Sequence, residues 1–401
     1  MPKWIKKLKR MVRRRPWIKW AAAGGAGIVV LAVAALLLLS GGDDVAPTFG
    51  DNTTTITLVA GGDLNVTDGT VASGQSGAGY DFTVPFLDVA EIFAQADAAL
   101  LNLEGNVCGA PYGSDSTSAP LALAQTLKAC GVDFLQTANS CAIKNGILGL
   151  SQTIANIRGT GMEPLGTYES NAAFAAGKGF VLRDIGGVRV AFVAFTKGMD
   201  GMGLPPGSEN CVNLLYTDYT STYKKINTQG ITRVLEAVEK AKPDITVALL
   251  HWGSEGNNTI SPTQKKIAKL MLSLGVDAII GTHSHQVQPV VYDAENHTLI
   301  AYSLGDFYGD GTVSGSYYSI LLQLQITKDL DTGYTAITGW EHIPLYTVTQ
   351  ERDGSAMRVL QIRQAMELYE NAHISSVSST TYENMKSALA QIEKRINTPV
   401  E

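Results

Sequence analysis

Carboxylates, histidines and an asparagine stand directly after apolar, strand-like segments of this sequence. The side chains at these segment ends are Asp63, Glu104, Asn139, His251, His283 and His285. In open α/β sheets, functional sites gather beyond the carboxyl ends of the strands, so we expect these side chains to converge. Carboxylates and imidazoles are common ligands of divalent metal ions. The pattern therefore predicts a metal site whose ligands are Asp63, Glu104, His251, His283 and His285.

The sharpest part of this pattern is residues 281–285, which read Gly-Thr-His-Ser-His. Residues two apart in an extended segment point the same way, so the rings of His283 and His285 are expected to reach one cluster. Each residue alone has a simpler interpretation. A histidine at a strand end can be a hydrogen-bonded structural residue, and a carboxylate there can cap a turn. Several such residues together favour contact with a metal or a substrate.

An alternation of strand and helix patterns must position these residues. Strands are predicted at Thr54–Ala60, Ala98–Leu103, Phe134–Thr137, Ile245–Leu250 and Val276–Ile280, and helices at Val84–Ala96, Leu121–Ala129, Gly146–Ile157 and Thr232–Ala241. A further helix begins after Ser261, which is a good N-cap because Pro262 and Gln264 follow it at the favoured spacing, and Gly275 ends it.

Antiparallel strands are expected as well. Phe180–Asp184 and Val188–Phe195 flank Ile185-Gly186-Gly187, which is a hairpin signal. Four later segments also look like antiparallel strands: Val290–Tyr292, Thr298–Tyr302, Tyr317–Ile326 and Tyr334–Trp340. This order predicts a layered α/β sandwich. Two final helical stretches, Ala356–Tyr369 and Tyr382–Ile396, are expected to be peripheral.

The N-terminus has the pattern of a membrane anchor. Nine lysines and arginines fall in the first twenty residues, and residues 21–39 carry no charge. About twenty apolar residues span a hydrocarbon core, and the basic flank is expected on the cytoplasmic side. We therefore expect a cytoplasmic tail (1–16), a transmembrane anchor (17–40), a linker (41–52), a main domain (53–347) outside the membrane and a C-terminal helical extension (348–401). A cleaved signal peptide is the alternative, although its apolar core is usually shorter.

Charge and cysteine content argue against several classes of function. Of 31 basic residues, nine lie in the N-terminal twenty, so the other 22 face 37 acidic residues. An acidic body argues against nucleic-acid binding. The four cysteines form no Cys-x-x-Cys pair, so zinc-ribbon and thioredoxin interpretations are poor. Disulfides and free thiols both stay open.

Six motifs in order resemble the CapA/PgsA poly-γ-glutamate capsule family, a branch of the calcineurin-like metallophosphatase fold. They are Gly62-Asp63, Asn102-Leu103-Glu104-Gly105, Thr137-Ala138-Asn139, His251-Trp252-Gly253-Ser254-Glu255, the run from Gly281 to Pro289, and Tyr302-Ser303-Leu304-Gly305-Asp306-Phe307. The resemblance covers about residues 54–346. It implies a four-layer αββα sandwich with one or two divalent ions (Mn, Zn or Fe) at the strand ends.

The resemblance also implies further site residues. Catalytic roles are expected for His251, Glu255 and Cys141. Substrate contacts are expected from Asn102, Asn139, Trp252 and Ser303.

The chain departs from the family pattern after Ala138-Asn139. The family usually continues with Asn and His and then Leu-Asp, whereas this chain has Ser140, Cys141 and Lys144. The usual Gly-Asn-Phe is Gly305-Asp306-Phe307. A hydroxyl is a poorer ligand than an amide carbonyl, and a thiol is no substitute for an imidazole acid. These changes put a second metal position and the proton-transfer step in doubt.

Three functions follow as hypotheses. The first is a membrane-anchored factor for an anionic envelope polymer of the poly-γ-glutamate type, with a membrane polymer-synthase complex as partner. The second is an extracytoplasmic metal-dependent hydrolase acting on phosphoester or amide bonds. The third is a degenerate, non-catalytic relative that binds polymer or a partner protein, which the changes at Ser140 and Cys141 motivate.

Overall fold

The computed structural model describes residues 49–400 except 312, 350–356 and 372–376. Residues Asn52–Glu401 form one compact unit. The predicted tail (1–16) and anchor (17–40), and most of the predicted linker (41–52), lie outside the described residues. Within the described part of the chain, every helix is too short or too polar to cross a membrane.

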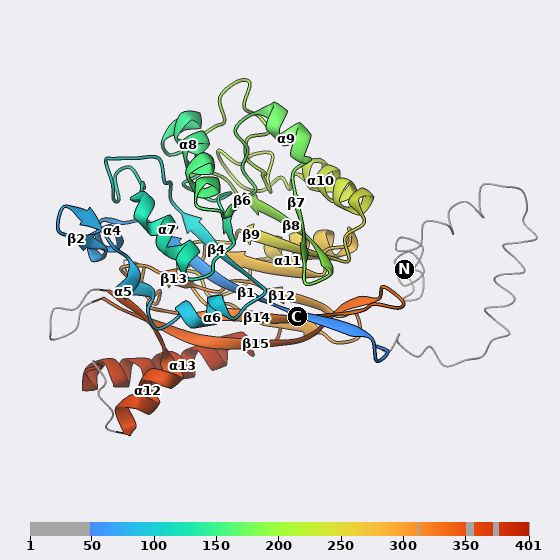
Figure 1. Ribbon diagram of the computed structural model, residues 1–401. Helices are drawn as coiled ribbons and strands as arrows, with labels where there is room; N and C mark the ends of the chain where they lie inside the picture. The colour runs from blue at the N-terminus through green and yellow to red at the C-terminus, as the bar shows by residue number, and fades with distance from the viewer. Residues whose placement is uncertain (1–48, 312, 350–356, 372–376, 401) are drawn as a thin grey trace, which may run out of the picture. The chain divides into compact units, whose positions relative to one another are not determined.

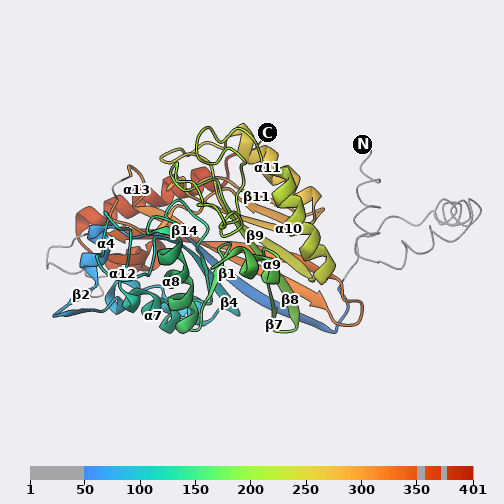
Figure 2. The same ribbon diagram turned by 90° about the horizontal axis from the view of Figure 1, so that it is seen from above.

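Two β-sheets form the centre of this unit (Figures 1 and 2). The first sheet has the order β16 (Arg358–Gln361), β15 (Thr335–Val348), β14 (Tyr318–Asp329), β1 (Thr53–Asn65), β4 (Ala98–Glu104), β5 (Phe134–Gln136) and β6 (Glu163–Leu165), and β13 (Asp306–Tyr308) also pairs with β1. The second has the order β11 (Val290–Asp293), β12 (Thr298–Ala301), β10 (Ala278–Thr282), β9 (Ile245–His251), β8 (Val188–Thr196) and β7 (Val181–Ile185). The strands that precede the polar residues are parallel: β1 pairs with β4, and β9 with β10.

The core between the sheets follows the two-residue period of the strands. Ile56 and Leu58 of β1 are buried in one cluster with Val247 and Leu249 of β9. The alternate residue Val59 instead joins Leu101 in a second cluster on the opposite face of the first sheet. Successive strand side chains point to opposite faces, so both faces of the first sheet are buried and both need a covering layer.

Helices supply these outer layers. The short helices α5 (Thr83–Phe86) and α6 (Ala90–Ala94), with α7 (Leu121–Ala129), cover the outer face of the first sheet. The helices α9 (Asn171–Gly177), α10 (Thr228–Ala241) and α11 (Pro262–Ser273) cover the second sheet. Helix α8 (Gly146–Gly159) packs largely against the loops after β5 and β8. A short helix, α4 (Asp68–Ser73), and a small hairpin of β2 (Gln75–Ser76) and β3 (Gly79–Tyr80) follow β1. The predicted α/β sandwich is confirmed.

Local signals in the sequence account for several boundaries. Ser261 and Gln264 form a reciprocal capping box at the start of α11, and the hairpin of β7 and β8 turns at Gly186-Gly187, both as predicted. The single helix expected at Val84–Ala96 is wrong, because α5 and α6 are separated by a turn. The Asp88 carbonyl in this turn accepts a 2.7 Å hydrogen bond from Gln361 Nε2. The carbonyl thus has a partner outside the helix.

The C-terminal segment is part of the sandwich and not a peripheral extension. Strand β16 extends the first sheet, and α12 (Ile362–Glu370) and α13 (Ser379–Ile396) lie against β14 and β15 (Figure 1). Met385 and Ile392 of α13 are fully buried in the core between the sheets. Their spacing places them on one face of the helix, so α13 completes the hydrophobic core.

Candidate metal centre

The polar residues predicted at strand ends meet at one place between the two sheets. Asp63 lies in β1 and Glu104 ends β4, both in the first sheet. His251 ends β9 in the second sheet, and the loop after β10 carries His283 and His285. The centre therefore lies at the carboxyl ends of strands from both sheets, where α/β folds place their sites.

Two glycines allow the backbones around this centre to approach closely. A Cβ atom at Gly62 would lie 1.8 Å from the Gly305 carbonyl oxygen, and one at Gly281 would lie 2.0 Å from the Tyr302 carbonyl oxygen. Asp63 N also donates to Gly305 O at 3.0 Å. A side chain at either glycine would collide with main chain, so these positions fix the spacing of the strands that carry the ligands.

His283 and His285 converge through a backbone different from the expected one. Their φ angles are 87° and 57°, in the left-handed region, so this loop is not the extended segment that the sequence suggested. His283 N donates to Asp63 Oδ2 at 2.8 Å, which ties the loop to β1. Such backbone angles are costly for residues with a Cβ and persist where surrounding contacts hold them.

Short contacts link the imidazoles to the carboxylates. His251 Nε2 lies 3.1 Å from Glu104 Oε1, and His285 Nδ1 lies 2.7 Å from Asp306 Oδ1. His285 also lies 3.9 Å from both Asp63 and Glu104. Three sets of residues offer ligand atoms within 4.8 Å of one another: Asp63–Glu104–His251, Asp63–His285–Asp306 and Glu104–His283–His285.

The donor set and its burial fit a divalent cation. Asp63 and His251 are completely buried, and the other members of the three sets are at most 8% exposed. Glu104 Oε2 and His283 Nδ1 are buried without a hydrogen-bond partner among the described residues. Buried polar atoms are almost always satisfied, so these two atoms point to a ligand that the protein itself does not provide. Mixed carboxylate and imidazole ligands suit Zn, Mn or Fe.

Burial and neighbouring charges shift the pKa values of the carboxylates and histidines in the centre. Burial and the charge of Glu104 raise the pKa of Asp63 to about 7. Glu104 is also buried, but the charge and hydrogen bond of His251 outweigh burial and hold its pKa well below the usual range. Burial opposes a charge on His285, yet Asp306, Glu104 and Asp63 raise its pKa to about 11. Burial lowers the pKa of His283.

The two asparagines expected to contact substrate are hydrogen-bonded to Asp63, to each other and to the main chain. Asn102 Nδ2 donates to Asp63 Oδ1 at 2.5 Å, and Asn139 Nδ2 donates to Leu103 O at 2.5 Å and to Asn102 Oδ1 at 3.2 Å. Asn139 Oδ1 accepts from Cys141 N at 3.0 Å. Both residues are buried and engaged with protein groups, so they orient the candidate ligands.

Trp252 and Ser303 do not occupy substrate-contact positions. The Trp252 side chain is fully buried in the core of the second sheet, stacks on Tyr302 and donates from Nε1 to its carbonyl at 2.8 Å. Ser303 is also fully buried, and its hydroxyl accepts from Gly305 N at 3.3 Å. An indole and a hydroxyl committed in this way stabilise the strand ends, which corrects the substrate roles expected for them.

The remaining predicted residues surround the centre. Ser140 Oγ donates to Glu104 Oε1 at 2.5 Å, so it replaces a possible metal contact with a hydrogen bond to a ligand. Burial raises the pKa of the Cys141 thiol, which disfavours the thiolate that a nucleophile or ligand requires. The four cysteines are free within the part of the chain that the structure describes. Glu255 is exposed on the loop after β9.

Three residues of this region were missed by the sequence reasoning. Asp306 belongs to one ligand set, although the sequence singled it out only as a departure from Asn. Thr196 Oγ1 lies 3.2 Å from His251 Nδ1, and Lys197 Nζ lies 3.1 Å from His283 Nε2. Both follow the predicted strand Val188–Phe195, so the strand-end rule that found His251 could have found them too.

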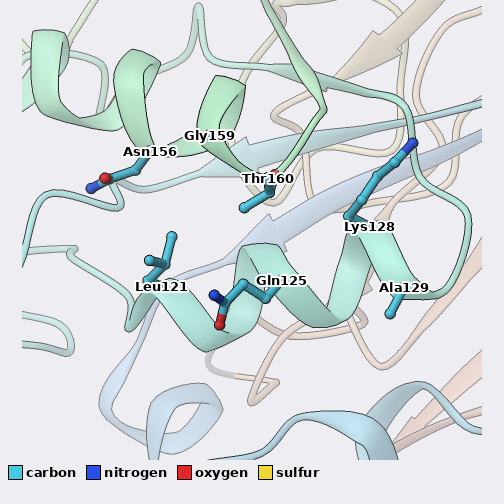
Figure 3. A pocket seen from close by; sticks show the side chains of 7 residues that line it. All are labelled: Leu121, Gln125, Lys128, Ala129, Asn156, Gly159 and Thr160. Carbon is cyan, nitrogen blue, oxygen red and sulfur yellow. The ribbon is translucent and has the colours of Figure 1, made fainter.

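A separate surface pocket of about 400 Å³ lies between α7 and α8 (Figure 3). It is lined by Leu121, Gln125, Lys128, Ala129, Asn156, Gly159 and Thr160. Its lining shares no residue with the polar centre, and Lys128 is paired with Asp133 at 2.8 Å. The pocket therefore offers no convergent polar groups comparable to those between the sheets.

Fold and centre together define an α/β sandwich protein with a buried carboxylate–histidine centre suited to a divalent metal. The family described as bacterial capsule synthesis protein PGA_cap matches residues 57–311. The chain belongs to this family, which confirms the resemblance found in its motifs.

Two curated relatives and several solved structures are similar to the chain. "Capsule biosynthesis protein CapA" of Bacillus anthracis is 28% identical over 50% of this chain and 46% of its own length. "PGA biosynthesis protein CapA" of Bacillus subtilis is 28% identical over 53% and 52%. The chain thus spans about half the length of the curated relatives it matches. The structure is also similar to a phosphatase of Mycoplasma pneumoniae (TM-score 0.46, 14% identity, 73% and 94% coverage) and to the calcineurin-like phosphoesterase YfkN of Bacillus subtilis (TM-score 0.43, 14%, 83% and 99%).

Proposed function

We propose that this chain acts in the biosynthesis of an anionic envelope polymer of the poly-γ-glutamate type, in its assembly, transport or release. The observation that carries the proposal is the family match over residues 57–311, which contain every residue of the three ligand sets. The relatives named for capsule and PGA biosynthesis support the same class of polymer.

The centre between the sheets would hold a divalent metal ion through the sets Asp63–Glu104–His251 and Asp63–His285–Asp306. Such an ion would supply Lewis-acid polarisation of a phosphoryl or carbonyl oxygen. The protein's own groups hold the ligands in place. Thr196 and Glu104 contact the two nitrogens of His251, Asp306 orients His285, and Asn102 orients Asp63. Partners of this kind fix ring orientation and ligand basicity.

Glu255 is exposed on the loop after β9, four residues after His251 in the chain. Glu255 is the catalytic candidate that meets solvent, whereas His251 is completely buried. We propose His251 as a ligand and Glu255 as the proton-transfer group of any reaction here.

A non-catalytic binding role is the second candidate, and the surroundings of Cys141 favour it. The thiol stays protonated because it is buried, and Ser140 is hydrogen-bonded to Glu104. Because Cys141 stands where the family usually has a histidine, the chain has no imidazole acid at this position. Metal-dependent turnover of a phosphoester or amide substrate by the purified chain would exclude the binding role and establish the hydrolase alternative.

For localisation, we propose a single-pass membrane protein with a cytoplasmic N-terminus and the centre outside the cytoplasmic membrane. A membrane polymer-synthase complex is the proposed partner. The support is the basic N-terminal segment followed by the uncharged residues 21–39. Protease added to intact spheroplasts should digest the main domain. A domain that resists protease until the membrane is lysed would place the centre inside.

The polymer role is tested by deleting the gene and measuring surface-bound and released polymer. Deletion should lower or redistribute the polymer, and the wild-type gene should restore it. Asp63→Asn should fail to restore it if the centre is needed, whereas the exposed Asp115→Asn should succeed. An unchanged polymer in the deletion strain contradicts the proposed function.

A further inference from the structure

The last turn of α13 contacts the loop that carries His285. Arg395 Nη1 donates to Gln286 Oε1 at 2.8 Å, and Gln286 directly follows His285 in the chain. Gln286 is only 3% exposed, and its Nε2 donates to Ser314 O at 2.7 Å. A guanidinium has only donors, so the amide oxygen of Gln286 must face Arg395. The residue after His285 is therefore held by a side chain 109 positions away in the chain.

The same guanidinium also contacts the strand that packs beside Asp306. Arg395 Cζ lies 5.2 Å from the centre of the Tyr318 ring, in a cation–π contact. Tyr318 begins β14, and its carbonyl oxygen packs closely against Gly305, because a Cβ there would lie only 3.1 Å away. Gly305 directly precedes Asp306 in the chain. Arg395 thus contacts a neighbour of His285 and a neighbour of the segment that carries Asp306.

Buried residues of the C-terminal segment fix the place of Arg395. Ile392 and Ile396 lie on either side of it along α13 and are at most 2% exposed, in the core between the sheets. Beyond the helix, Val400 packs against the core between the second sheet and its helices. This segment lies outside residues 57–311, which match the family. The contact with the centre therefore comes from a part of the chain beyond the family region.

We propose that Arg395 is a positioning residue of the candidate metal centre. His285 and Asp306 belong to one ligand set, and their spacing depends on two segments, the loop after β10 and the start of β13. By contacting Gln286 and Tyr318 together, the guanidinium holds these segments at the spacing that the ligand set needs. A guanidinium has no lone pair to offer a metal, so Arg395 acts through its neighbours. The inference rests on the proposed metal centre and adds the C-terminal helix to it.

The test is the affinity of the full chain for Mn²⁺, measured by calorimetric titration of the metal-free protein. Arg395→Met keeps an unbranched apolar stem but removes the donors, and it should weaken Mn²⁺ binding by about tenfold, as loss of a partner behind the ligands does. Charge alone predicts the opposite, because removing a cation near a metal site favours cation binding. Lys394→Met, a control that removes the exposed charge next to Arg395, should change the affinity by less than about twofold, because salt screens an exposed charge.

A double variant shows whether Arg395 acts through Gln286. Gln286→Met keeps the length of the side chain but removes its amide, and it should weaken Mn²⁺ binding by about tenfold. The double variant should stay well short of the loss of about a hundredfold that independent effects would give, because both changes remove one shared contact. A loss of about a hundredfold would overturn the inference. Arg395→Lys retains a donor for Gln286 and should recover part of the affinity.

Hydrogen exchange of the metal-free chain gives a readout that needs no ion. His283 N donates to Asp63 Oδ2, and Gln288 N donates to Ser303 O, so both amides report on the order of the loop after β10. Arg395→Met should speed exchange at residues 283–288 by about tenfold, which corresponds to the loss of one hydrogen bond to a charged group. Exchange in β9 should stay unchanged.

Wild-type affinity and wild-type exchange in Arg395→Met would overturn the inference while leaving the metal centre intact. Binding of no Mn²⁺ by the wild type would overturn the metal centre and the inference with it. If Arg395→Met does not fold, as judged by circular dichroism and thermal melting, Gln286→Met and Arg395→Lys test the same contact. The polymer measurement in the deletion strain tests the proposed function separately.

Discussion

His285 Nδ1 and Asp306 Oδ1 lie 2.7 Å apart, and both side chains are almost completely buried. A contact of this length between a buried carboxylate and an imidazole is a charge-assisted hydrogen bond. It fixes the ring so that Nε2 points toward Glu104, 3.9 Å from its Oε2. Asp306 thus orients His285 and balances its charge.

Replacing Asp306 by Asn should lower the pKa of His285 from about 11 toward its usual value. Burial already opposes the charged ring, and Asp306 is the strongest of the groups that favour it. An NMR titration of the imidazole resonances in the metal-free protein measures this change. Asp115→Asn, on an exposed loop, should leave the titration unchanged. An equally high pKa in Asp306→Asn would mean that Asp63 and Glu104 alone hold the charge.

Replacing Asp63 by Asn should weaken Mn²⁺ binding by about 10-fold to 100-fold or more. Asp63 belongs to two of the three ligand sets, and an amide lacks the carboxylate charge that a hard cation prefers. Calorimetric titration of the full chain measures the affinity, with Asp115→Asn as the matched control. Equal affinities in Asp63→Asn and wild type would remove Asp63 from the centre.

Metal affinity should rise with pH across the neutral range. The pKa of Asp63 is raised to about 7 and that of His285 to about 11, so both groups carry a proton below pH 7 in the metal-free protein. Ligands must lose their protons to bind a metal. The logarithm of the binding constant should therefore rise by roughly two per pH unit below pH 7 and by roughly one above it. Titrations between pH 5.5 and 8.5 check this slope, and a flat profile would contradict it.

Removing the metal should lower the stability of the chain. An ion that binds the folded state stabilises it by about 2.7 kcal/mol when its concentration is 100 times the dissociation constant. Chelation should therefore lower the melting temperature of the wild type and leave that of Asp63→Asn almost unchanged. The comparison distinguishes a bound ion from a general effect of the chelator, which would lower both melting temperatures alike.

Ala at Gly62 should destabilise the fold by about 3 kcal/mol or more, because its Cβ would overlap the Gly305 carbonyl at 1.8 Å. Gly79→Ala is the matched control, since the nearest atom to its Cβ would be 3.8 Å away. Urea unfolding of the full chain gives both free energies. Similar values for the two variants would show that β1 and β13 can separate without cost.

The sequence predicted most of the strands and the convergence of their ends, because both follow from local patterns. Buried strands such as Ile245–His251 are continuous apolar runs, and the rule for parallel strands then places their C-terminal residues together. The capping box at Ser261 is equally local.

The features that the sequence could not predict depend on contacts between distant segments. The loop with the positive φ angles of His283 and His285 is tied at His283 N to Asp63, which lies 220 residues away in the chain. The burial of Trp252 depends on Tyr302 in the neighbouring strand region. The role of α13 depends on its packing against β14, whereas its own sequence shows only an amphipathic helix. The hydrophobic periodicity of a helix shows which of its faces is apolar, but not which other element packs against that face.

The centre joins strand ends of two different sheets, and this has a consequence for the order of folding. Asp63 and His283 are 220 residues apart in the chain, and Glu104 and His251 are 147 apart. Neither sheet alone carries a complete ligand set that includes His251, so this set is assembled only when the two sheets have docked. Contacts over such separations form late, after the chain has lost most of its conformational entropy. A bound ion would thus be among the last contacts to form during folding. Its binding would report that the two sheets have docked.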